Sequence, residues 1–457
     1  MEHQLHIDLA DIAMIIASFI AVLVAGVIGA KKTSHAGGAD FVLAGRSLTL
    51  PFFVSSLVAT WYGAVLGSGE FVMRYGVVFI ICFGVPYYLV AIVYARWLSK
   101  RIRSSKAVSI PDQLGIAYGP RARTVSALIM LVITIPAAYQ LMLGIIVQSL
   151  TGWSLLASII IATVLSTAYV YKGGLRSDVY ANVVQFVLMY AGFIALVIAC
   201  ISAFGSPLEL FDSLPTSHLS IPGELGWMPV IVWFVVAMQT FIDPNFHIRA
   251  AAANSTSTAQ KGIYISVGLW MLFDVLQLLA GLYAFVHIKS VAPTDTYMNL
   301  AQVVLPSLWK GLFVSGVIAA VMSTLDGYAL VSATTIGHDL IDRWNSKEPR
   351  VTSLRVGLLI TVAIGASIAW YVPSIIDLMY NAASIAVPAL LVPLLLSFTP
   401  LAERFQRGIV PNLLIPAIAS AASLIANVGE PMFVGLVTSF ILHLLRSLRR
   451  GTQTLKY

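Results

Sequence analysis

The chain has 457 residues, of which 59% are hydrophobic and only 10% are charged. Soluble domains carry about 25% charged residues, so this composition excludes a soluble globular protein, and its apolar content excludes a disordered chain. A formal net charge of +7 would suggest a nucleic-acid partner in a soluble chain, but here the placement of the basic residues carries the information.

Apolar runs of about 20 residues recur along the chain, which is the length that an α-helix needs to cross a bilayer. The runs are continuous, unlike the alternating strands of about 10 residues in an outer-membrane β-barrel. We therefore predict an all-α polytopic membrane protein with about 13 transmembrane helices in a single domain, residues 1–457. In chain order the predicted spans are 9–30, 48–73, 76–99, 124–149, 153–171, 178–204, 227–247, 262–288, 310–338, 352–371, 374–398, 409–427 and 431–447.

The basic residues fall on one side of these spans. If the N-terminus lies outside, the inner loops hold every Lys and Arg, Arg249 among them, except Arg74, Lys289 and Lys310. Cytoplasmic loops are enriched in Lys and Arg, so we predict a multi-pass protein of the plasma (inner) membrane with a cytoplasmic C-terminus. Cys82 and Cys200 lie inside apolar runs and are expected to be buried hydrophobic side chains.

Two spans contain residues that interrupt helices. Span 48–73 has three glycines between residues 63 and 69, and span 227–247 ends with Asp243-Pro244-Asn245. Each feature alone fits close helix packing or a simple kink. Together they occupy matching positions five spans apart, which indicates an inverted-repeat carrier with discontinuous helices at the substrate site.

This symmetry predicts the organisation of the domain. Residues 48–204 would form the first inverted repeat and residues 227–398 the second. The helices at 9–30 and 409–447 would be peripheral.

Carboxylates inside the spans are the next unusual feature. Asp274 and Asp326 lie in the middle of their spans, Asp243 lies in the inner part of its span, and Asp178 lies near a span end. Buried acids are costly in a membrane and often mark ion or proton paths, although Asp274 also fits a structural hydrogen-bonding role. Near Asp326, the hydroxyls of Ser323 and Thr324 could bond to carbonyls one turn back, or could ligate a hard cation together with carbonyls of the broken second span.

Four segments in this order resemble the sodium:solute symporter family, which includes sodium/proline, sodium/sugar and sodium/choline carriers. The resemblance covers roughly residues 40–450. The segments are Phe41-Val42-Leu43-Ala44-Gly45-Arg46-Ser47-Leu48; Gly173-Gly174-Leu175 leading to Val183-Val184-Gln185; Arg249-Ala250-Ala251-Ala252-Ala253 followed by Ala259-Gln260-Lys261-Gly262; and Ala320-Val321-Met322-Ser323-Thr324.

The resemblance implies a LeuT-type 5+5 inverted-repeat core and sodium-coupled uptake of a small organic solute by alternating access. It implies a sodium site made of carbonyls from the first and eighth core helices and two hydroxyls from the eighth. The matching positions here are Ala59, Tyr62, Ala320, Ser323 and Thr324.

One departure from the family concerns the acidic residues. Many members have an acid where this chain has Asn182, whereas here Asp178 lies one turn earlier and Asp326 replaces a small hydroxyl residue. We hypothesise that the charge near the ion has moved from the sixth span to the ninth. A possible second ion or proton site therefore comprises Asp326, Asn182, Asp178 and Asp274.

The substrate cavity is expected between the two helix breaks. Its candidate lining residues are Trp61, Leu66, Tyr87, Tyr88, Tyr139, Gln140, Trp233, Gln239, Tyr380 and Asn381. The spans contain acids but no clearly mid-membrane Lys or Arg, which favours a cationic, zwitterionic or neutral solute. The aromatic side chains would suit a quaternary ammonium group.

Two alternatives remain open: a proton-coupled carrier of the same fold, and a transport-incompetent sensor or channel-like protein on this scaffold. The spans contain no constellation of catalytic residues, so no enzyme and no cofactor is expected. The expected partners are sodium as the coupling ion, a small organic solute and the lipid bilayer, with no nucleic acid and no obligate protein partner.

Overall fold

The computed structural model describes residues 6–33, 37–288, 295–342, 348–372, 374–406 and 408–451, so Lys289 lies outside the described residues. Within these ranges the chain is helical, apart from a single isolated bridge between Leu48 and Ala253. Eleven of these helical stretches are long and apolar enough to cross a membrane.

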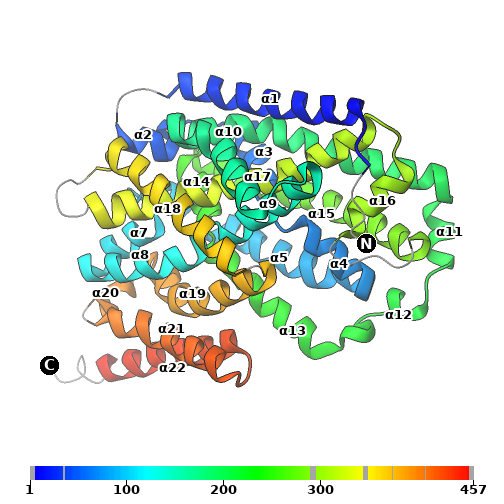
Figure 1. Ribbon diagram of the computed structural model, residues 1–457. Coiled ribbons are helices and arrows are strands. Elements are labelled where there is room, and N and C mark those ends of the chain that lie inside the picture. Colours follow the sequence, from blue (N-terminus) through cyan, green and yellow to red (C-terminus); the bar gives the residue numbers. More distant parts are fainter. Residues whose placement is uncertain are drawn as a thin grey trace.

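The elements follow one another from the N-terminus through short connections (Figure 1). The first half contains α1 (Leu9–Lys31), α2 (Gly38–Leu43), η1 (Ala44–Arg46), α3 (Leu50–Ala59), α4 (Val65–Tyr75), η2 (Ile80–Gly84), α5 (Val85–Val93), η3 (Tyr94–Leu98), α6 (Ser99–Ser104), α7 (Ile110–Tyr118), α8 (Pro120–Thr134), α9 (Ala137–Thr151), α10 (Leu155–Phe204), α11 (Pro207–Asp212), α12 (Thr216–Leu219) and η4 (Gly223–Leu225). The second half contains α13 (Trp227–Val236), η5 (Ala237–Ile242), α14 (Pro244–Ala252), α15 (Thr256–His287), α16 (Thr296–Val304), α17 (Trp309–Thr334), η7 (Thr335–Ile341), α18 (Val351–Tyr371), α19 (Ile375–Ser397), α20 (Ala402–Phe405), α21 (Ile409–Ala426) and α22 (Pro431–Gly451).

The 13 predicted spans and the eleven stretches describe the same helices. The span predicted at 48–73 is divided into α3 and α4, which are each too short to be counted as a crossing. The spans predicted at 153–171 and 178–204 run together as α10, which is interrupted where Gly174 adopts a φ of +58°. Glycine populates that region without the steric penalty that a Cβ would bring, so the chain can change direction there.

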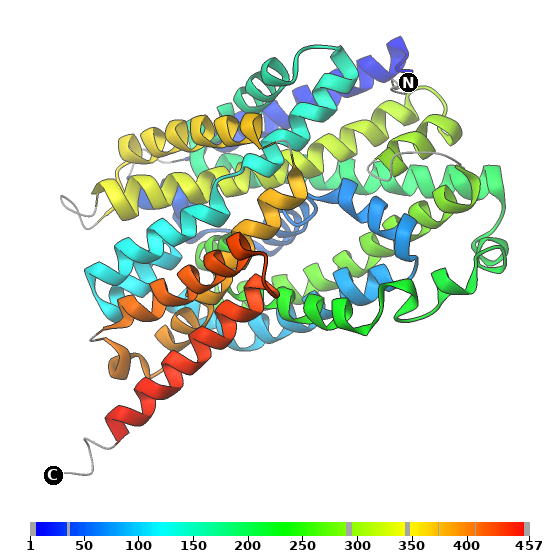
Figure 2. The ribbon, with the colours of Figure 1, turned by 60° about the horizontal axis from the view of Figure 1, so that its bottom comes forward.

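Burial distinguishes the centre of the helix bundle from its periphery. In the most apolar part of α17 and η7, 89% of the residues are buried, whereas in α1 only 22% are buried. α17 packs against α10, α1, α18 and α9, and α21 and α22 pack against α19 at the edge of the bundle (Figure 2). The exposed Ile and Val side chains along α1 suit a helix that faces lipid.

The start of α1 is nevertheless fixed to the core. Asp11 is fully buried, and one carboxylate oxygen accepts hydrogen bonds from the backbone N–H groups of Leu308 at 2.9 Å and Gly311 at 2.7 Å. Its other oxygen lies 3.4 Å from Lys310 Nζ. The N-terminus of α17 and a basic side chain both stabilise a negative charge, so this contact holds a lipid-facing helix against the central one.

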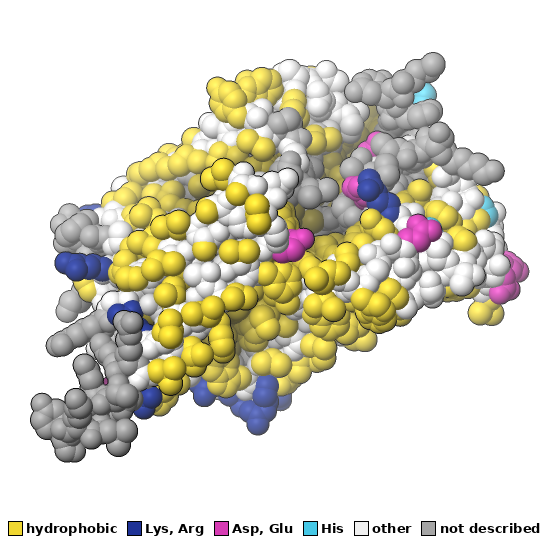
Figure 3. All heavy atoms as spheres, turned by 90° about the horizontal axis from the view of Figure 1, so that it is seen from below, with side chains coloured by type: hydrophobic (Ala, Val, Ile, Leu, Met, Phe, Trp, Pro, Cys, Tyr) yellow, Lys and Arg dark blue, Asp and Glu magenta, His cyan; other side chains and the backbone are white. Residues whose placement is uncertain are grey.

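The charged surface is asymmetric along the direction of the helices. Most of the Lys and Arg side chains visible in Figure 3 lie in its left half and most of the visible Asp and Glu lie to the right, with a broad hydrophobic surface between them. Such an arrangement is that of a protein surrounded by lipid.

Candidate functional site

The second predicted span is broken where the glycine-rich segment begins. α3 ends at Ala59, the residues from Thr60 to Ala64 are not α-helical, and α4 begins at Val65. Backbone carbonyls at such a break lose their helical partners and must find others inside the protein. Here α17 supplies the hydrogen-bond donors for these carbonyls. Ser323 Oγ donates to the Ala59 carbonyl at 2.6 Å, and Thr324 Oγ1 lies 3.1 Å from the Thr60 carbonyl.

The same two hydroxyls also lie 3.0 Å from the carbonyl of Ala320 on their own helix. A hydroxyl has one proton, so it can donate to only one of these carbonyls at a time and keeps lone pairs available to a cation. The hydroxyls and carbonyls therefore form a neutral cluster of oxygen atoms between α3 and α17, all of it buried. Hard cations prefer several oxygen ligands, so this donor set fits sodium.

Four of the five predicted ligands meet at this cluster: Ala59, Ala320, Ser323 and Thr324. The carbonyl of Tyr62 accepts a hydrogen bond from Val65 N at 3.1 Å. The carbonyl beside Thr324 is that of Thr60, which the sequence reasoning did not name because the position of the break within the glycine-rich segment could not be fixed to one residue.

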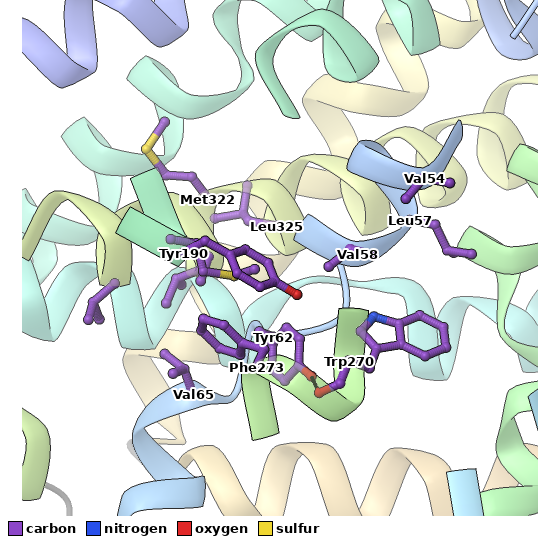
Figure 4. Close-up of a cluster of buried hydrophobic side chains, with 14 of the residues drawn as sticks. Val54, Leu57, Val58, Tyr62, Val65, Tyr190, Trp270, Phe273, Met322 and Leu325 are labelled. Atoms are coloured by element: carbon purple, nitrogen blue, oxygen red, sulfur yellow. Dashed lines mark hydrogen bonds between the residues drawn. The ribbon is translucent and has the colours of Figure 1, made fainter. Parts of the chain in front are cut away.

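The side chain of Tyr62 connects the break to α15. Its hydroxyl lies 3.0 Å from the carbonyl of Trp270 (Figure 4). It also lies 2.9 Å from Asp274 Oδ1. Asp274 also accepts from the hydroxyl of Tyr88 and from Gln277 Nε2 at 3.3 Å. This carboxylate has no Lys, Arg or His partner among the described residues, so hydroxyl and amide donors alone surround it.

Asp326 lies one turn or less beyond the two hydroxyls and has a different environment. It is fully buried, and its oxygens accept hydrogen bonds from Ser166 Oγ at 2.5 Å and from the hydroxyl of Tyr169, both on α10. In the part of the chain that the structure describes, it forms no ion pair. Asn182, fully buried on α10, lies one turn from Asp178.

Asp178 is engaged by a residue that was expected in a loop. Arg249 lies beyond the predicted end of its span at residue 247, but α14 continues to Ala252 and Arg249 is fully buried, so the loop assignment is wrong. Its guanidinium donates to Asp178 Oδ2 at 2.9 Å, to Asn245 Oδ1 at 2.9 Å and to Ser56 Oγ at 3.2 Å. A buried guanidinium requires such a counter-charge, and the resulting pair joins α14, α10 and α3.

The second predicted break is also present. α13 is followed by the 3₁₀ segment η5, then Asp243 in an extended conformation, and then α14 beginning at Pro244. Pro244 suits the first position of a helix because its missing N–H would have no partner there. Asp243 caps α14, since Oδ1 accepts from Asn245 N at 2.8 Å and from Phe246 N at 3.0 Å.

A cavity of about 540 Å³ opens beside this second break. Its walls come from α8, α9, η5, α14, α17, α18 and α19, and most of the lining is apolar. The side chains with polar groups in the lining are those of Tyr139, Gln239, Asp243, Tyr328 and Asn381. A mostly apolar hollow with a few polar groups is typical of a small-molecule site.

Three of the predicted cavity residues, Tyr139, Gln239 and Asn381, line this cavity. Tyr87 is connected to it, because Gln239 Nε2 donates to its hydroxyl at 3.0 Å. Trp61 packs behind Tyr87, with ring centroids 5.5 Å apart, and also against Trp270 at 5.0 Å.

The other predicted cavity residues lie elsewhere. Gln140 donates to Thr163 Oγ1 at 3.2 Å and to the carbonyl of Val362 at 3.1 Å, away from the cavity. Tyr380 donates to Glu430 at 2.6 Å, Trp233 packs against Phe83, and Leu66 is packed into the main core. Tyr88 belongs to the Asp274 network.

Two of the polar lining residues, Asp243 and Tyr328, were not among the predicted cavity residues. Asp243 was noted only as an intramembrane acid, although the adjacent proline already marked the break. Tyr328 donates to Asp243 Oδ2 at 3.0 Å, and its ring is stacked on that of Tyr139 with centroids 5.3 Å apart. Nothing in its sequence neighbourhood distinguished it from a packing aromatic.

A third polar cluster lies in η7 and at the starts of α7 and α8. Ligand atoms of Asp112, His338 and Asp339 lie within 4.8 Å of one another, but Arg123 already bonds to Asp339 at 3.0 Å and lies 3.5 Å from Asp112. Burial raises the pKa of Asp112, but the hydrogen bond with His338 and the charge of Arg123 outweigh burial and hold the pKa below its usual value. Arg123 pairs with both carboxylates, so this cluster joins helices.

Comparison with known proteins agrees with this arrangement. The chain is 24% identical over 395 residues to the sodium-coupled monocarboxylate transporter 1 of Xenopus laevis, covering 78% of this chain and 59% of that protein. It is 22% identical over 379 residues to the high-affinity proline transporter PutP of Bacillus subtilis (strain 168), covering 76% of this chain and 78% of that protein. The chain thus spans about 60% of the length of the monocarboxylate transporters that it matches.

Solved structures confirm the predicted LeuT-type helical fold. A substrate-bound, outward-open Na⁺-coupled sialic acid symporter matches with a TM-score of 0.81 at 15% identity, covering 95% of this chain and 96% of that one. The nucleobase-cation-symport-1 family transporter Mhp1 matches with a TM-score of 0.63 at 15% identity, covering 92% and 96%. The model of the sodium:solute symporter family matches residues 41–404, and the chain is therefore a multi-pass membrane protein that belongs to this family.

Proposed function

We propose that this protein is a secondary active symporter, which couples inward sodium movement to the uptake of a small organic solute by alternating access. The observation that carries the proposal is the oxygen cluster between the broken helix α3–α4 and α17, made by Ala59, Thr60 and Ala320 carbonyls and the hydroxyls of Ser323 and Thr324. The relatives named above are carriers for sodium-coupled or proline transport, which supports a transporter and not an enzyme.

Sodium binding at this cluster would add a shared cation to the packing and hydrogen bonds that already join α3 and α17. A cation between α3 and α17 stabilises whichever conformation holds the two helices together, so sodium shifts the population toward that state. At a membrane potential of −100 mV, each sodium that enters contributes about 2.3 kcal/mol in addition to its concentration gradient. This energy would drive solute accumulation without ATP or another cofactor.

The proposal includes the predicted organisation and orientation. The breaks at Thr60–Ala64 and at Asp243 lie in residues 48–204 and 227–398, which supports these two segments as inverted repeats. The distribution of Lys and Arg supports an outer N-terminus and a cytoplasmic C-terminus.

A proton-coupled carrier is the second candidate, favoured by the environments of Asp274 and Asp326. Each is buried among hydroxyl or amide donors without a basic partner in the described ranges, and a carboxylate in such a place is more readily accommodated with a proton. We propose that Asp326, with Asn182 and Asp178 nearby on α10, belongs to the second ion or proton site, and Asp274 to a separate one.

Uptake into proteoliposomes tests the main proposal. Transport of a panel of amino acids, amines, sugars and carboxylates is measured with an inward sodium gradient and in sodium-free buffer at several pH values. Sodium-dependent uptake of at least one solute is expected, whereas uptake driven by a pH gradient alone would favour the proton-coupled candidate.

The variants Ser323→Ala and Thr324→Ala locate the site. Each removes one oxygen, and the sodium concentration for half-maximal uptake should rise about 10-fold or more, because hydrogen bonds to charged groups contribute about 1.5–3 kcal/mol. Ser315→Ala is the matched control, since Ser315 is buried on the same helix and its hydroxyl bonds only to the Gly311 carbonyl, at 2.8 Å. Equal sodium dependence in all three variants would contradict the assignment.

A further inference from the structure

Among the described residues that line the cavity at the second helix break, Asp243 is the one acidic residue, and none is Lys, Arg or His. The nearest Lys or Arg along α14 is Arg249, whose guanidinium is taken up by Asp178, Asn245 and Ser56. A charge in a mostly apolar hollow favours a ligand group of the opposite sign.

The helix that Asp243 caps stabilises the charged form of its carboxylate. Oδ1 accepts hydrogen bonds from two N–H groups at the start of α14, where the helix dipole also favours a negative charge. Oδ2 accepts only the Tyr328 hydroxyl, at 3.0 Å, among the described residues. An oxygen of a carboxylate has two lone pairs, so Oδ2 has one left for a donor in the cavity.

Aromatic rings complete this corner of the cavity. Tyr139 on α9 and Tyr328 on α17 are stacked at 5.3 Å with an interplanar angle of 22°, and both line the cavity together with Asp243. Aromatic faces attract cations through their quadrupole, and anions gain nothing from them. The lining continues past Asn381 to the apolar residues Ile368, Val372 and Leu378, near the adjoining ends of α18 and α19.

We propose that this cavity binds the transported solute through a protonated amine, with an N–H group donating to Asp243 Oδ2 beside the rings of Tyr139 and Tyr328. The solute is accordingly a primary or secondary amine or a zwitterion, with an apolar body of a size that suits about 540 Å³. This inference rests on the proposed function and names the substrate class for it. It differs from the quaternary ammonium expected from the aromatics alone, because the free lone pair of Oδ2 needs an N–H donor.

Equilibrium binding to the purified full-length protein tests the proposal without depending on ion coupling. The probes are three sets of matched scaffolds: n-butylamine, 4-aminobutyrate and butyrate; pyrrolidine, proline and cyclopentanecarboxylate; and glucosamine, glucose and glucuronate. Binding is followed by intrinsic tryptophan fluorescence and by calorimetry at constant sodium. Within at least one set, every member with an ammonium group should bind at least 10-fold more tightly than every member without one.

Asp243→Asn separates charge from shape. Asparagine is also a good N-cap, so α14 should remain capped, but the negative charge is lost. Affinity for the amine should fall about 30-fold or more, as for the loss of one partner of a buried charge pair. The preference for amines over the matched compounds without an ammonium group should disappear. Tyr328→Phe retains the ring and the carboxylate and should keep the amine preference. Glu209→Gln, at the capping box of α11 on the surface, is the control that should bind like the parent protein.

Several results would overturn the proposal. Equal or tighter binding of the members without an ammonium group (butyrate, cyclopentanecarboxylate, glucose and glucuronate) in every set would do so, as would an unchanged amine preference in Asp243→Asn or no binding of any probe. Amine affinity that falls as sodium rises would assign Asp243 to an inorganic cation instead. Sodium-independent uptake of a bound amine would contradict the proposed sodium coupling but not the amine site. Sodium-dependent uptake of a carboxylate alone would contradict the amine site but not the sodium coupling.

Discussion

Asp326 is the residue at which the choice of coupling ion can be tested most directly. Its carboxylate receives hydrogen bonds from Ser166 and Tyr169 and follows the proposed sodium ligands Ser323 and Thr324 along α17. Asp326→Asn keeps nearly the same shape and removes the charge. If the acid supports sodium binding, the variant should transport fewer charges per solute and require about 10-fold more sodium, as expected for one hydrogen bond or contact to a charged group.

The measurement is the ratio of current to labelled-solute uptake in proteoliposomes, at pH 6 to pH 8 in the parent protein and the variant. Ser166→Ala serves as the control for lost hydrogen bonding without lost charge. A variant with the parent's ratio and sodium dependence would show that Asp326 does not take part in coupling. Loss of pH dependence alone would assign the site to a proton.

The ion pair of Asp178 and Arg249 leads to a prediction about stability. Both side chains are fully buried, so removal of one partner leaves an uncompensated charge that costs about 3–5 kcal/mol. Asp178→Asn and Arg249→Met should each lower the melting temperature of the detergent-solubilised protein markedly. The double variant should recover much of the loss, because no buried charge remains. Additive losses in the double variant would mean that the two side chains act independently.

At the scale of the elements, the spans and both breaks could be predicted from the sequence, because apolar length, glycine and proline act locally. The orientation of each helix about its axis could not. Neighbouring Tyr139 and Gln140 show the difficulty: the first lines the cavity, while the second faces Thr163 and Val362. A membrane helix is apolar on the faces toward lipid and toward protein alike, so periodicity does not separate them.

For a related reason, contacts between elements far apart in the chain could not be predicted from the sequence. Arg249 was expected in a loop because basic residues mark the cytoplasmic side, and only tertiary packing brings Asp178 to it. The hydroxyl pair on α17 was identified because two adjacent hydroxyls lie near an intramembrane acid, and the family resemblance then matched them to a sodium site. Tyr328 and Thr60 carried no such signal.

The first break depends on a close approach that only glycine allows. A Cβ on Gly63 would lie 2.6 Å from Thr324 Cβ and from Tyr139 Cε1, so Gly63→Ala should separate the break from α17. We expect weaker sodium activation of uptake, by about 10-fold, since a displacement that costs 1.4 kcal/mol has that effect. Gly67→Ala is the matched control, because a Cβ at Gly67 meets nothing within 4 Å and α4 is helical there.

Sodium-activation curves for the two variants provide the measurement. Helix formation favours alanine over glycine, so Gly67→Ala should preserve or slightly raise thermal stability. The same sodium dependence of uptake in both variants would contradict a role for the close approach of Gly63 to Thr324.

At the scale of the whole molecule, the uneven distribution of charge predicts which end of the bundle faces the cytoplasm. Basic residues follow the ends of α1 and α6, and the opposite end carries Arg74 and Lys310, each paired with an acid. Leu208 on α11 is 78% exposed at the end opposite to Ser104, which is exposed at the end of α6. Both natural cysteines, Cys82 and Cys200, are fully buried, so the parent protein should react little with a membrane-impermeant thiol reagent.

Single cysteines at these positions then report the orientation. Leu208→Cys should be labelled in intact cells, and Ser104→Cys only after the membrane is permeabilised. The result bears on the coupling as well as on topology, because the cavity lining includes Val372 and Leu378, which lie at the end of the bundle opposite to α6. With that end outside, these lining residues lie on the side from which sodium and solute would enter. The opposite labelling pattern would place them on the cytoplasmic side and would contradict the proposed orientation of uptake.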